Sequence, residues 1–201
     1  VNVMDASELY DPEFRELIEK QNPTIIIPIG SLEQHGAHLP ITTDSDIVTE
    51  IASRLAKKCG FIAFPTISYG LSDEHWPMIN VSANFYETLR ELIISLVSNE
   101  IKSVIILNGH HGNVKLLEVF EKRQQEWEKM LQEEKEGVFG LPASVITAQH
   151  RFKDFKISFH SYWHFMEREF DHAGFVETSI MLAISDKVKM KKAKKGFTTK
   201  G

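Results

Sequence analysis

The chain has 201 residues, 42% of them hydrophobic and 25% charged, with a net charge of −5, and we expect one domain spanning residues 1–201. Its apolar runs are too short to cross a membrane and no cationic apolar leader precedes them, so the sequence predicts a cytoplasmic protein without a membrane partner. The single cysteine, Cys59, excludes an internal disulfide and a thiolate zinc framework, which leaves His, Asp and Glu as metal ligands.

Apolar stretches typical of buried strands alternate along the chain with segments of helical period. The strands are expected at 24–29, 61–67, 103–107 and 143–148. The helices are expected at about 11–20, 46–58, 86–101, 114–135 and 174–185. This alternation predicts an α/β domain on a mainly parallel sheet, in which ligands bind beyond the carboxyl ends of the strands.

The loop after the first predicted strand carries a carboxylate and an imidazole close together. Glu33 and His35 are two residues apart, so their side chains point to the same side of an extended segment. Asp44 needs only a modest loop to return to them. These residues outline a set of metal ligands, although a single loop histidine is more often a solvated group than a ligand.

Two further polar groups fall where such a sheet places its ligands. His110 directly follows strand 103–107, between glycines that permit tight backbone geometry. His172 lies in the loop before helix 174–185, and Glu177 lies near the first turn of that helix. Because both groups are expected at the same sheet edge as Glu33, they could share one metal centre with it, and solvated or locally hydrogen-bonded side chains are the alternative.

The region 159–164 contains two histidines and an aromatic pair. His160 and His164 are four residues apart, a spacing that places two imidazoles on one helical face. We favour a polar helix surface here over a second metal site. Trp163, together with Trp76 from an earlier loop, is a candidate for stacking on a planar substrate, although aromatic residues more often belong to the core.

Residues 187–201 hold seven lysines and no acids, which leaves a net charge of −12 on the rest of the chain. This asymmetry argues against a nucleic-acid-binding body. A solvated terminus is the interpretation we favour for the lysines, and an anion-binding arm is the alternative.

Four strings in order resemble motifs of the creatininase (creatinine amidohydrolase) family. They are Pro28-Ile29-Gly30-Ser31-Leu32-Glu33-Gln34-His35-Gly36-Ala37-His38-Leu39-Pro40 with Thr43-Asp44, Gly70-Leu71-Ser72-Asp73-Glu74-His75, Asn108-Gly109-His110-His111-Gly112-Asn113 and His172-Ala173-Gly174-Phe175-Val176-Glu177-Thr178-Ser179. The resemblance covers about 24–184. It implies a three-layer αβα fold, two divalent metal ions per chain (zinc, iron or manganese), hydrolysis of a non-peptide C–N bond in a small amide, and a homo-oligomer, often a hexamer.

The resemblance also implies roles for particular residues. Carried over by position, Glu33, Asp44 and His110 would hold one metal ion, and His35 with the bridging Asp44 would hold the other. Glu177 would complete the set as a ligand, which is the role we favour, and a catalytic role as a proton shuttle is the alternative. A hydroxide that bridges the two ions would attack the amide carbonyl.

The leaving amine also needs a proton. His172 is the expected donor because imidazole titrates near neutral pH, and a structural role in capping helix 174–185 is the alternative.

Two departures from the family pattern bear on the substrate. Gly112 stands where creatinine-cleaving members carry a metal-binding glutamate, and Trp76-Pro77-Met78 follows His75 in place of the usual Phe-Pro-Gly-Thr. We expect His75, Trp76 and Trp163 to border the substrate pocket.

Relatives of the Gly112 type include archaeal enzymes that remove a formyl group from a ribosylaminopyrimidine phosphate in flavin and deazaflavin synthesis. That formamide hydrolase is our leading expectation. A mycofactocin precursor peptidase and a creatinine amidohydrolase are alternatives, and a non-catalytic metal-binding module is the alternative of another class.

Overall fold

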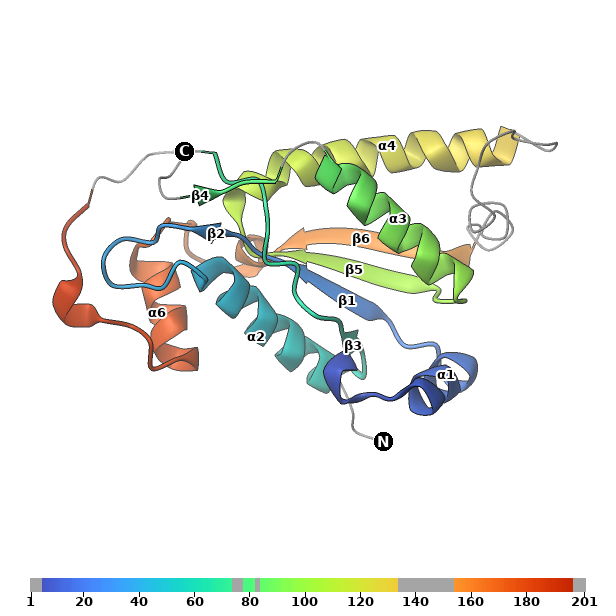
Figure 1. The fold of residues 1–201 in the computed structure, drawn as a ribbon, viewed down its shortest axis with the longest axis horizontal. Coiled ribbons are helices and arrows are strands. Elements are labelled where there is room, and N and C mark those ends of the chain that lie inside the picture. The colour runs from blue at the N-terminus through green and yellow to red at the C-terminus, as the bar shows by residue number, and fades with distance from the viewer. Residues whose placement is uncertain (1–4, 74–77, 82–83, 134–153, 197–201) are drawn as a thin grey trace.

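The fold is built around a four-stranded parallel sheet of order β3-β1-β5-β6. The structure, a computed structural model, describes residues 5–73, 78–81, 84–133 and 154–196. The central strands are β1 (Ile25–Ile29), β3 (Ile62–Ala63), β5 (Ser103–Asn108) and β6 (Lys156–Ser161). A small antiparallel pair, β2 (Leu32–Glu33) and β4 (Met78–Ile79), lies beyond the carboxyl end of β1, as Figure 1 shows.

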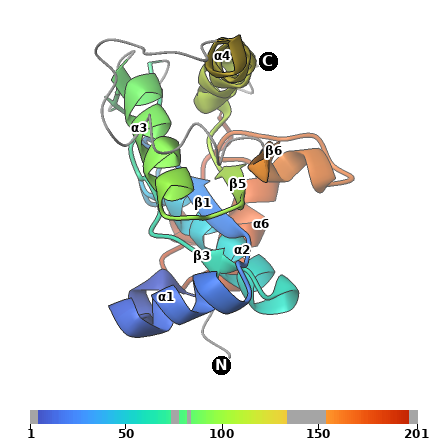
Figure 2. The same ribbon diagram turned by 90° about the vertical axis from the view of Figure 1, so that its right-hand side faces the viewer.

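Helices cover both faces of the sheet, so the expected three-layer αβα arrangement is confirmed (Figures 1 and 2). The helices are α1 (Asp11–Lys20), α2 (Thr43–Cys59), α3 (Asn84–Ser98), α4 (Val114–Glu133) and α6 (Phe175–Ile184). Side chains alternate across a strand, and accordingly Ile25 and Ile27 of β1 pack in one cluster with residues of α1, α3 and α4. Ile26 packs in another with α2. Burial on both faces explains the unbroken apolar run in β1.

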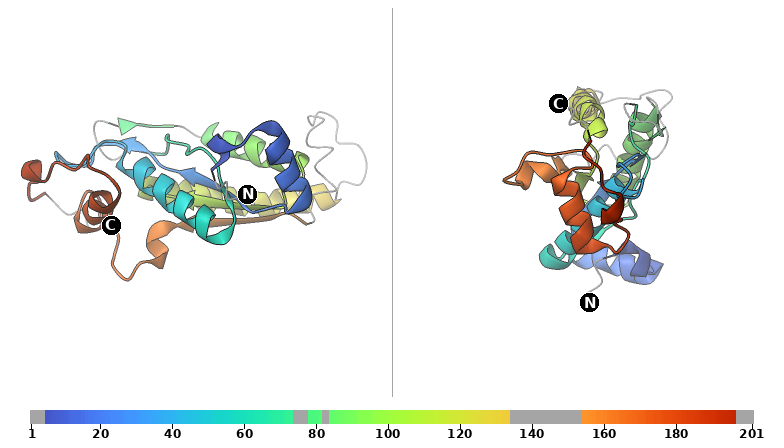
Figure 3. Two further views of the ribbon diagram at one scale, coloured as in Figure 1. Left: turned by 90° about the horizontal axis from the view of Figure 1, so that it is seen from below. Right: turned by 90° about the vertical axis from the view of Figure 1, so that its left-hand side faces the viewer.

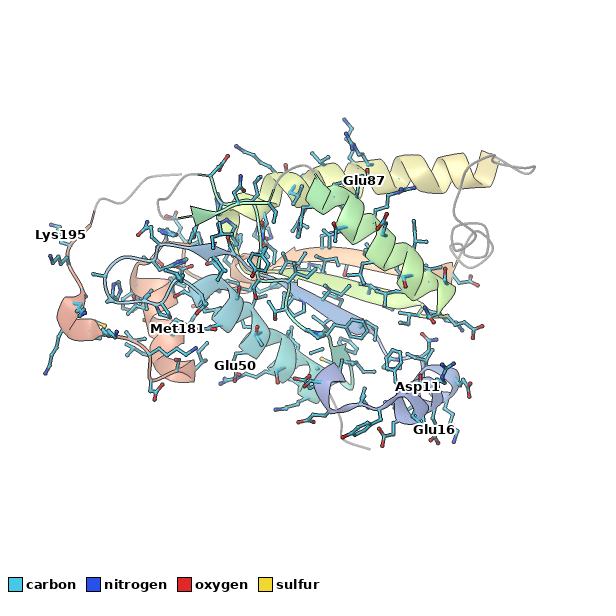
Figure 4. All side chains as sticks on the ribbon, viewed as in Figure 1. Asp11, Glu16, Glu50, Glu87, Met181 and Lys195 are labelled. Atoms are coloured by element: carbon cyan, nitrogen blue, oxygen red, sulfur yellow. The ribbon has the colours of Figure 1, made fainter. Side chains whose placement is uncertain are left out.

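The remaining face of α2 packs against α6. Ile47 of α2 and Met181 of α6 are both fully buried in a shared cluster, and Met181 is labelled in Figure 4. This contact brings the first turn of α6 close to the loop that follows β1. No helix among the described residues is long and apolar enough to cross a membrane.

The helices expected from periodicity are all present, with ends that shift by a few residues. The strand expected at 61–67 is shorter than predicted and the structure assigns only Ile62–Ala63 to it. The strand expected at 143–148 lies outside the described residues. The helical spacing expected for His160 and His164 is wrong, because His160 lies on β6, where polar and apolar residues alternate, and His164 lies in the short 3-10 turn Tyr162–Phe165.

Strand register explains why the polar loops meet at one edge. Ile29 of β1 pairs with Asn108 of β5, so the residues that follow both strands leave the sheet side by side. The N–H of Gly109 donates to the Ile29 carbonyl at 2.8 Å. A β-carbon at Gly109 would lie 2.7 Å from the Asp44 carbonyl oxygen, so only glycine lets the first turn of α2 approach this closely.

Candidate metal centre

Five acidic and imidazole side chains converge beyond the carboxyl ends of β1 and β5. Glu33 ends β2, His35 follows it in the loop, and Asp44 lies in the first turn of α2. His110 directly follows β5, and Glu177 lies in the first turn of α6. The most exposed of the five, His110, has only 5% of its surface exposed. Every residue expected as a ligand is therefore at this one place.

The donor atoms form two groups that share Asp44. We call Glu33, Asp44 and His110 the 33–110 triad, and His35, Asp44 and Glu177 the 35–177 triad. Within each, one ligand atom per residue lies within 4.8 Å of the others. Nδ1 of His110 is 2.9 Å from Asp44 Oδ2, and Nε2 of His35 is 3.0 Å from Asp44 Oδ1. The two oxygens of Asp44 thus face different imidazoles, as a bridging carboxylate requires.

Backbone carbonyls fix the orientation of both imidazoles. Nδ1 of His35 donates to the carbonyl of Glu33 at 3.1 Å, so Nε2 is the nitrogen that faces Asp44 and Glu177. Nε2 of His110 donates to the carbonyl of Leu71 at 2.9 Å, so Nδ1 faces the carboxylates. A metal-binding histidine commonly has its second nitrogen held in this way, which leaves the first one available to the ion.

Ser72 orients the third ligand of the 33–110 triad. Its buried hydroxyl donates to Oε2 of Glu33, while Oε1 of the same carboxylate faces His110. The Ser72 N–H donates to the side-chain oxygen of Asn80 at 2.9 Å, which holds the serine in place. Sequence reasoning placed Ser72 in a family motif but gave it no role, because a serine carries no metal-ligand signal of its own.

The structure explains why the third motif has glycine at position 112. A β-carbon at Gly112 would collide with the Leu71 carbonyl oxygen and would lie 2.5 Å from Nε2 of His110. The carbonyl that orients His110 therefore occupies the space that a side chain at 112 would need. The carboxylate that the 35–177 triad does not share with the other triad, Glu177, comes from α6 rather than from this loop.

The electrostatics of the centre fit divalent cations. Burial lowers the pKa of His35, but Asp44 and Glu177 outweigh it and raise this pKa to about 11. Burial raises the pKa of Asp44, but His110 and His35 hold it at about 2. Asp44 is therefore an anion, and positive charge is favoured throughout the centre.

One buried carboxylate oxygen of the centre lacks a donor. Asp44 Oδ2 has the His110 imidazole beside it at 2.9 Å, whereas Glu177 Oε1 accepts no hydrogen bond from the part of the chain that the structure describes. A buried carboxylate oxygen without a partner is costly, and a bound cation removes that cost. The mixture of imidazole and carboxylate suits zinc, iron or manganese.

His172 lies beside both triads at the edge of the centre. Its Nε2 donates to the carbonyl of Gln34 at 2.9 Å, and its Nδ1 is 3.4 Å from Glu33 Oε1. Its ring centroid is 4.5 Å from that of His35, and 22% of its side chain is exposed. Asp171, rather than His172, caps α6, because both Asp171 oxygens lie 3.1 Å from the N–H of Val176. The alternative that His172 caps this helix is therefore wrong.

The residues expected to contact substrate are only partly placed. His75 and Trp76 lie outside the described residues. Trp163 is 9% exposed and packs on Phe170 with ring centroids 4.6 Å apart. The ring of His111 stacks on Phe170 with an interplanar angle of 12°, and its centroid is 6.0 Å from that of Trp163. Substrate contact by Trp163 stays a prediction.

A separate cavity of about 620 Å³ lies between α2, α6 and the strands β5 and β6. Its walls are mostly apolar and include Ile51, Leu107 and Ile184, and none of the five convergent residues lines it. This cavity is therefore distinct from the acidic centre.

Comparison with known proteins decides the family. A sequence model of the creatininase family, described as creatinine amidohydrolase, matches residues 7–201. The chain belongs to the creatininase family. A creatinine amidohydrolase from Pseudomonas putida is 23% identical over 204 residues, which cover 89% of this chain and 71% of that protein.

Two other creatininase-family relatives are more similar over a shorter region. A 2-amino-5-formylamino-6-ribosylaminopyrimidin-4(3H)-one 5'-monophosphate deformylase from Methanosphaera stadtmanae is 38% identical over 103 residues, covering 48% of this chain and 44% of that protein. A mycofactocin precursor peptide peptidase from Mycobacterium ulcerans is 35% identical over 107 residues, covering 47% of this chain and 43% of that protein. The matched part thus spans less than half the length of these two relatives.

Solved creatininase structures share the fold. The structure titled "Creatininase Mn" superposes with a TM-score of 0.77 at 22% identity, covering 94% of this chain and 76% of that chain. A mutant creatininase of "Zn-Zn type" gives a TM-score of 0.77 at 23% identity, covering 96% of this chain and 77% of that chain. At this identity the likeness establishes the fold alone.

Proposed function

We propose that this protein is a metal-dependent hydrolase that cleaves a non-peptide C–N bond in a small amide. One observation carries the proposal: two triads of buried ligands share Asp44, and each of its oxygens faces a different imidazole. Membership of the creatininase family supports the same reaction class. We also propose a single catalytic domain that acts in the cytoplasm as a homo-oligomer, with a hexamer as the form that the family resemblance implies.

Two divalent ions, of zinc, iron or manganese, are the proposed cofactors. Glu33, Asp44 and His110 would hold one ion, and His35, Asp44 and Glu177 would hold the other. When bound, such a pair of ions polarises a carbonyl group and lowers the pKa of water. The three buried carboxylates supply the negative charge that two dications need.

His172 is the proposed proton donor to the leaving nitrogen. Its Nε2 is engaged by the Gln34 carbonyl, so Nδ1 is the atom that faces the centre and carries the proton to the substrate. Partial exposure of this side chain lets Nδ1 recover a proton from solvent between turnovers. Glu177 is assigned as a ligand because its Oε2 faces His35, with the Ala173 N–H donating to it at 2.6 Å.

The substrate we favour is a formamide on a ribosylaminopyrimidine phosphate. The support is the identity of 38% to the archaeal deformylase over 103 residues, against 23% to the creatinine amidohydrolase over 204 residues. Cleavage of a mycofactocin precursor peptide is the second candidate, because identity to that peptidase is 35% over 107 residues. Creatinine is third, since Gly112 replaces the glutamate expected of creatinine-cleaving members.

The test is a substrate panel assayed with protein reconstituted with zinc, manganese or iron. The panel contains the formylaminopyrimidine ribotide, creatinine and short peptides, and Asp44→Asn is the inactive control. Glu50→Gln, on an outer face of the same helix, is the matched active control because Glu50 pairs only with exposed Arg54 in the described structure. We expect metal-dependent release of formate from the ribotide. Stoichiometric metal binding without cleavage of any amide would favour the non-catalytic module instead.

A further inference from the structure

The segment after α6 is rich in lysine and contacts the loop and the helix that carry metal ligands. We call residues 187–196 the lysine strap. Its lysines are Lys187, Lys189, Lys191, Lys192, Lys194 and Lys195. The strap leaves α6 and passes the loop between β2 and α2, as Figures 1 and 3 show. Lys195, labelled in Figure 4, marks its far end. The lysine side chains of the strap are all exposed, as expected of a solvated segment.

Three contacts anchor the strap to the segments that carry the metal ligands. The N–H of Lys189 donates to the carbonyl of His38 at 2.8 Å. Nζ of Lys187 donates to Asp46 Oδ2 at 3.1 Å, two residues after the bridging Asp44. Val188 packs against the cluster that holds Leu39 and Met181. The strap is therefore fixed both to the ligand loop and to the first turn of α2.

His38 connects this anchor to the centre itself. Its Nε2 lies 2.9 Å from the hydroxyl oxygen of Thr178, and Thr178 directly follows the ligand Glu177. The side chain of His38 thus bridges the ligand loop and α6, while its carbonyl holds the strap. The residue that anchors the backbone of Lys189 thus also contacts the helix that carries Glu177.

Several lysines of the strap have no carboxylate partner among the described residues. Within the described ranges, no carboxylate pairs with Lys189, Lys191 or Lys192, whereas Lys187 pairs with Asp46. All of these lysines are exposed. The centre contains the carboxylates of Glu33, Asp44 and Glu177, so an anion is attracted by the strap and repelled by the centre unless cations are bound there.

We infer that the lysine strap binds the phosphate of a phosphate-monoester substrate and so holds the amide end of that substrate over the metal centre. This inference rests on the proposed hydrolase function and names the chemical class of its substrate. Lysine ammonium groups on flexible stems suit a phosphate as mobile point charges. A small dianion is also a better match than a nucleic acid, because the rest of the chain carries a net charge of −12 and repels a long polyanion.

The test measures equilibrium binding of ribose 5-phosphate to the zinc-loaded protein by calorimetry at low ionic strength. The variant Lys191→Ala with Lys192→Ala removes two exposed charges from the strap. Its matched control, Lys57→Ala with Lys58→Ala, removes two exposed charges from the last turn of α2, at the opposite end from Asp44. We expect the dissociation constant to rise about tenfold in the strap variant and to change by less than about twofold in the control. Added salt should weaken wild-type binding, and ribose should not compete.

Equal affinity in the wild type and the strap variant would overturn the inference, and so would an equal loss in both double variants. The readout needs no turnover, so it is separate from the test of the hydrolase. Amide cleavage with no effect of the strap variant on phosphate binding overturns the phosphate site and leaves the proposed function standing. Phosphate binding that depends on the strap, without cleavage of any amide in the panel, overturns the proposed function and leaves the phosphate site standing.

Discussion

The two triads share Asp44 but are held in different ways. Both non-shared ligands of the 33–110 triad are restrained by one short segment, because Ser72 donates to Glu33 and the Leu71 carbonyl accepts from His110. The 35–177 triad depends on Glu177, which reaches the centre from α6 and retains one oxygen without a donor in the described structure. If the triads bind ions as proposed, we expect the first triad to be prepared before an ion arrives and the second to be completed by its ion.

Removal of the carboxylate that both triads share should abolish binding of both ions. Asp44→Asn keeps the shape of the side chain but removes the charge that both ions share. We expect amide hydrolysis to fall by about 10⁴-fold, as for other residues that act as part of one catalytic unit. Elemental analysis should show loss of both ions while circular dichroism shows a folded protein. Activity within tenfold of the wild type would show that Asp44 does not bridge.

Glu177→Gln should separate the two triads. Its amide no longer contributes negative charge to the 35–177 triad, and the 33–110 triad is untouched. We expect one ion per chain to be retained and hydrolysis to fall by about 10³-fold, because two-ion catalysis is lost. Glu50→Gln serves as the control and should retain both ions. Retention of two tightly bound ions by Glu177→Gln would instead assign Glu177 to proton transfer.

His172 lies beside both triads but is a member of neither. In His172→Gln we expect both ions to remain and hydrolysis to fall by about 10²-fold, within the range for loss of a general acid. Hydrolysis of amides with better leaving groups should suffer less, because they need the proton less. The measurement is the ratio of rates for two such amides, and an equal loss for both would mean that His172 is not the proton donor.

Ser72 tests the idea that the 33–110 triad is prepared in advance. Ser72→Ala removes the hydrogen bond to Glu33 and should weaken binding of one zinc ion by about 10- to 100-fold, as orienting contacts to metal ligands usually do. Competition with a chromophoric chelator measures this. Ser179→Ala, an exposed position on α6 whose hydroxyl donates to the Phe175 carbonyl, is the matched control. A loss of affinity confined to the ion of the 35–177 triad would contradict the idea that Ser72 prepares the 33–110 triad.

Release of a proton on metal binding is the smallest of the expected effects, and it reports directly on the 35–177 triad. The pKa of His35 in the metal-free protein is raised to about 11, so His35 carries a proton at pH 7 that a bound ion must displace. Metal affinity should therefore increase with pH below that value. Calorimetry in buffers of different ionisation enthalpy should detect release of about one proton from His35. Binding without proton release would show that His35 is not a ligand.

The sequence predicted most of this centre for a simple physical reason. Parallel strands deliver their carboxyl ends to one sheet edge, so residues that directly follow β1 and β5, such as Glu33 and His110, had to meet. Glu177 was harder, because whether it acts as ligand or proton shuttle depends on how α6 packs on α2. The sequence did not predict the strand order or β6. The short alternation at Lys156–Ser161 was interpreted as helical spacing around His160.

Contacts made by the backbone were the least predictable. Backbone carbonyls orient His110, through Leu71, and anchor Lys189, through His38. Because every residue type has a backbone carbonyl, no side-chain pattern signals such contacts. For the same reason the lysine-rich segment reads as solvated from composition alone. Only the folded chain shows that Lys189 and Lys187 hold it against the ligand loop and α2.

Anomalous diffraction from crystals of the zinc-loaded protein tests the central claim most directly. The account predicts two zinc peaks per chain roughly 3.5 Å apart. One oxygen of Asp44 should be bound to each ion, with Glu33 and His110 on one and His35 and Glu177 on the other. A single zinc peak, or two peaks with Asp44 bound to only one of them, would contradict it.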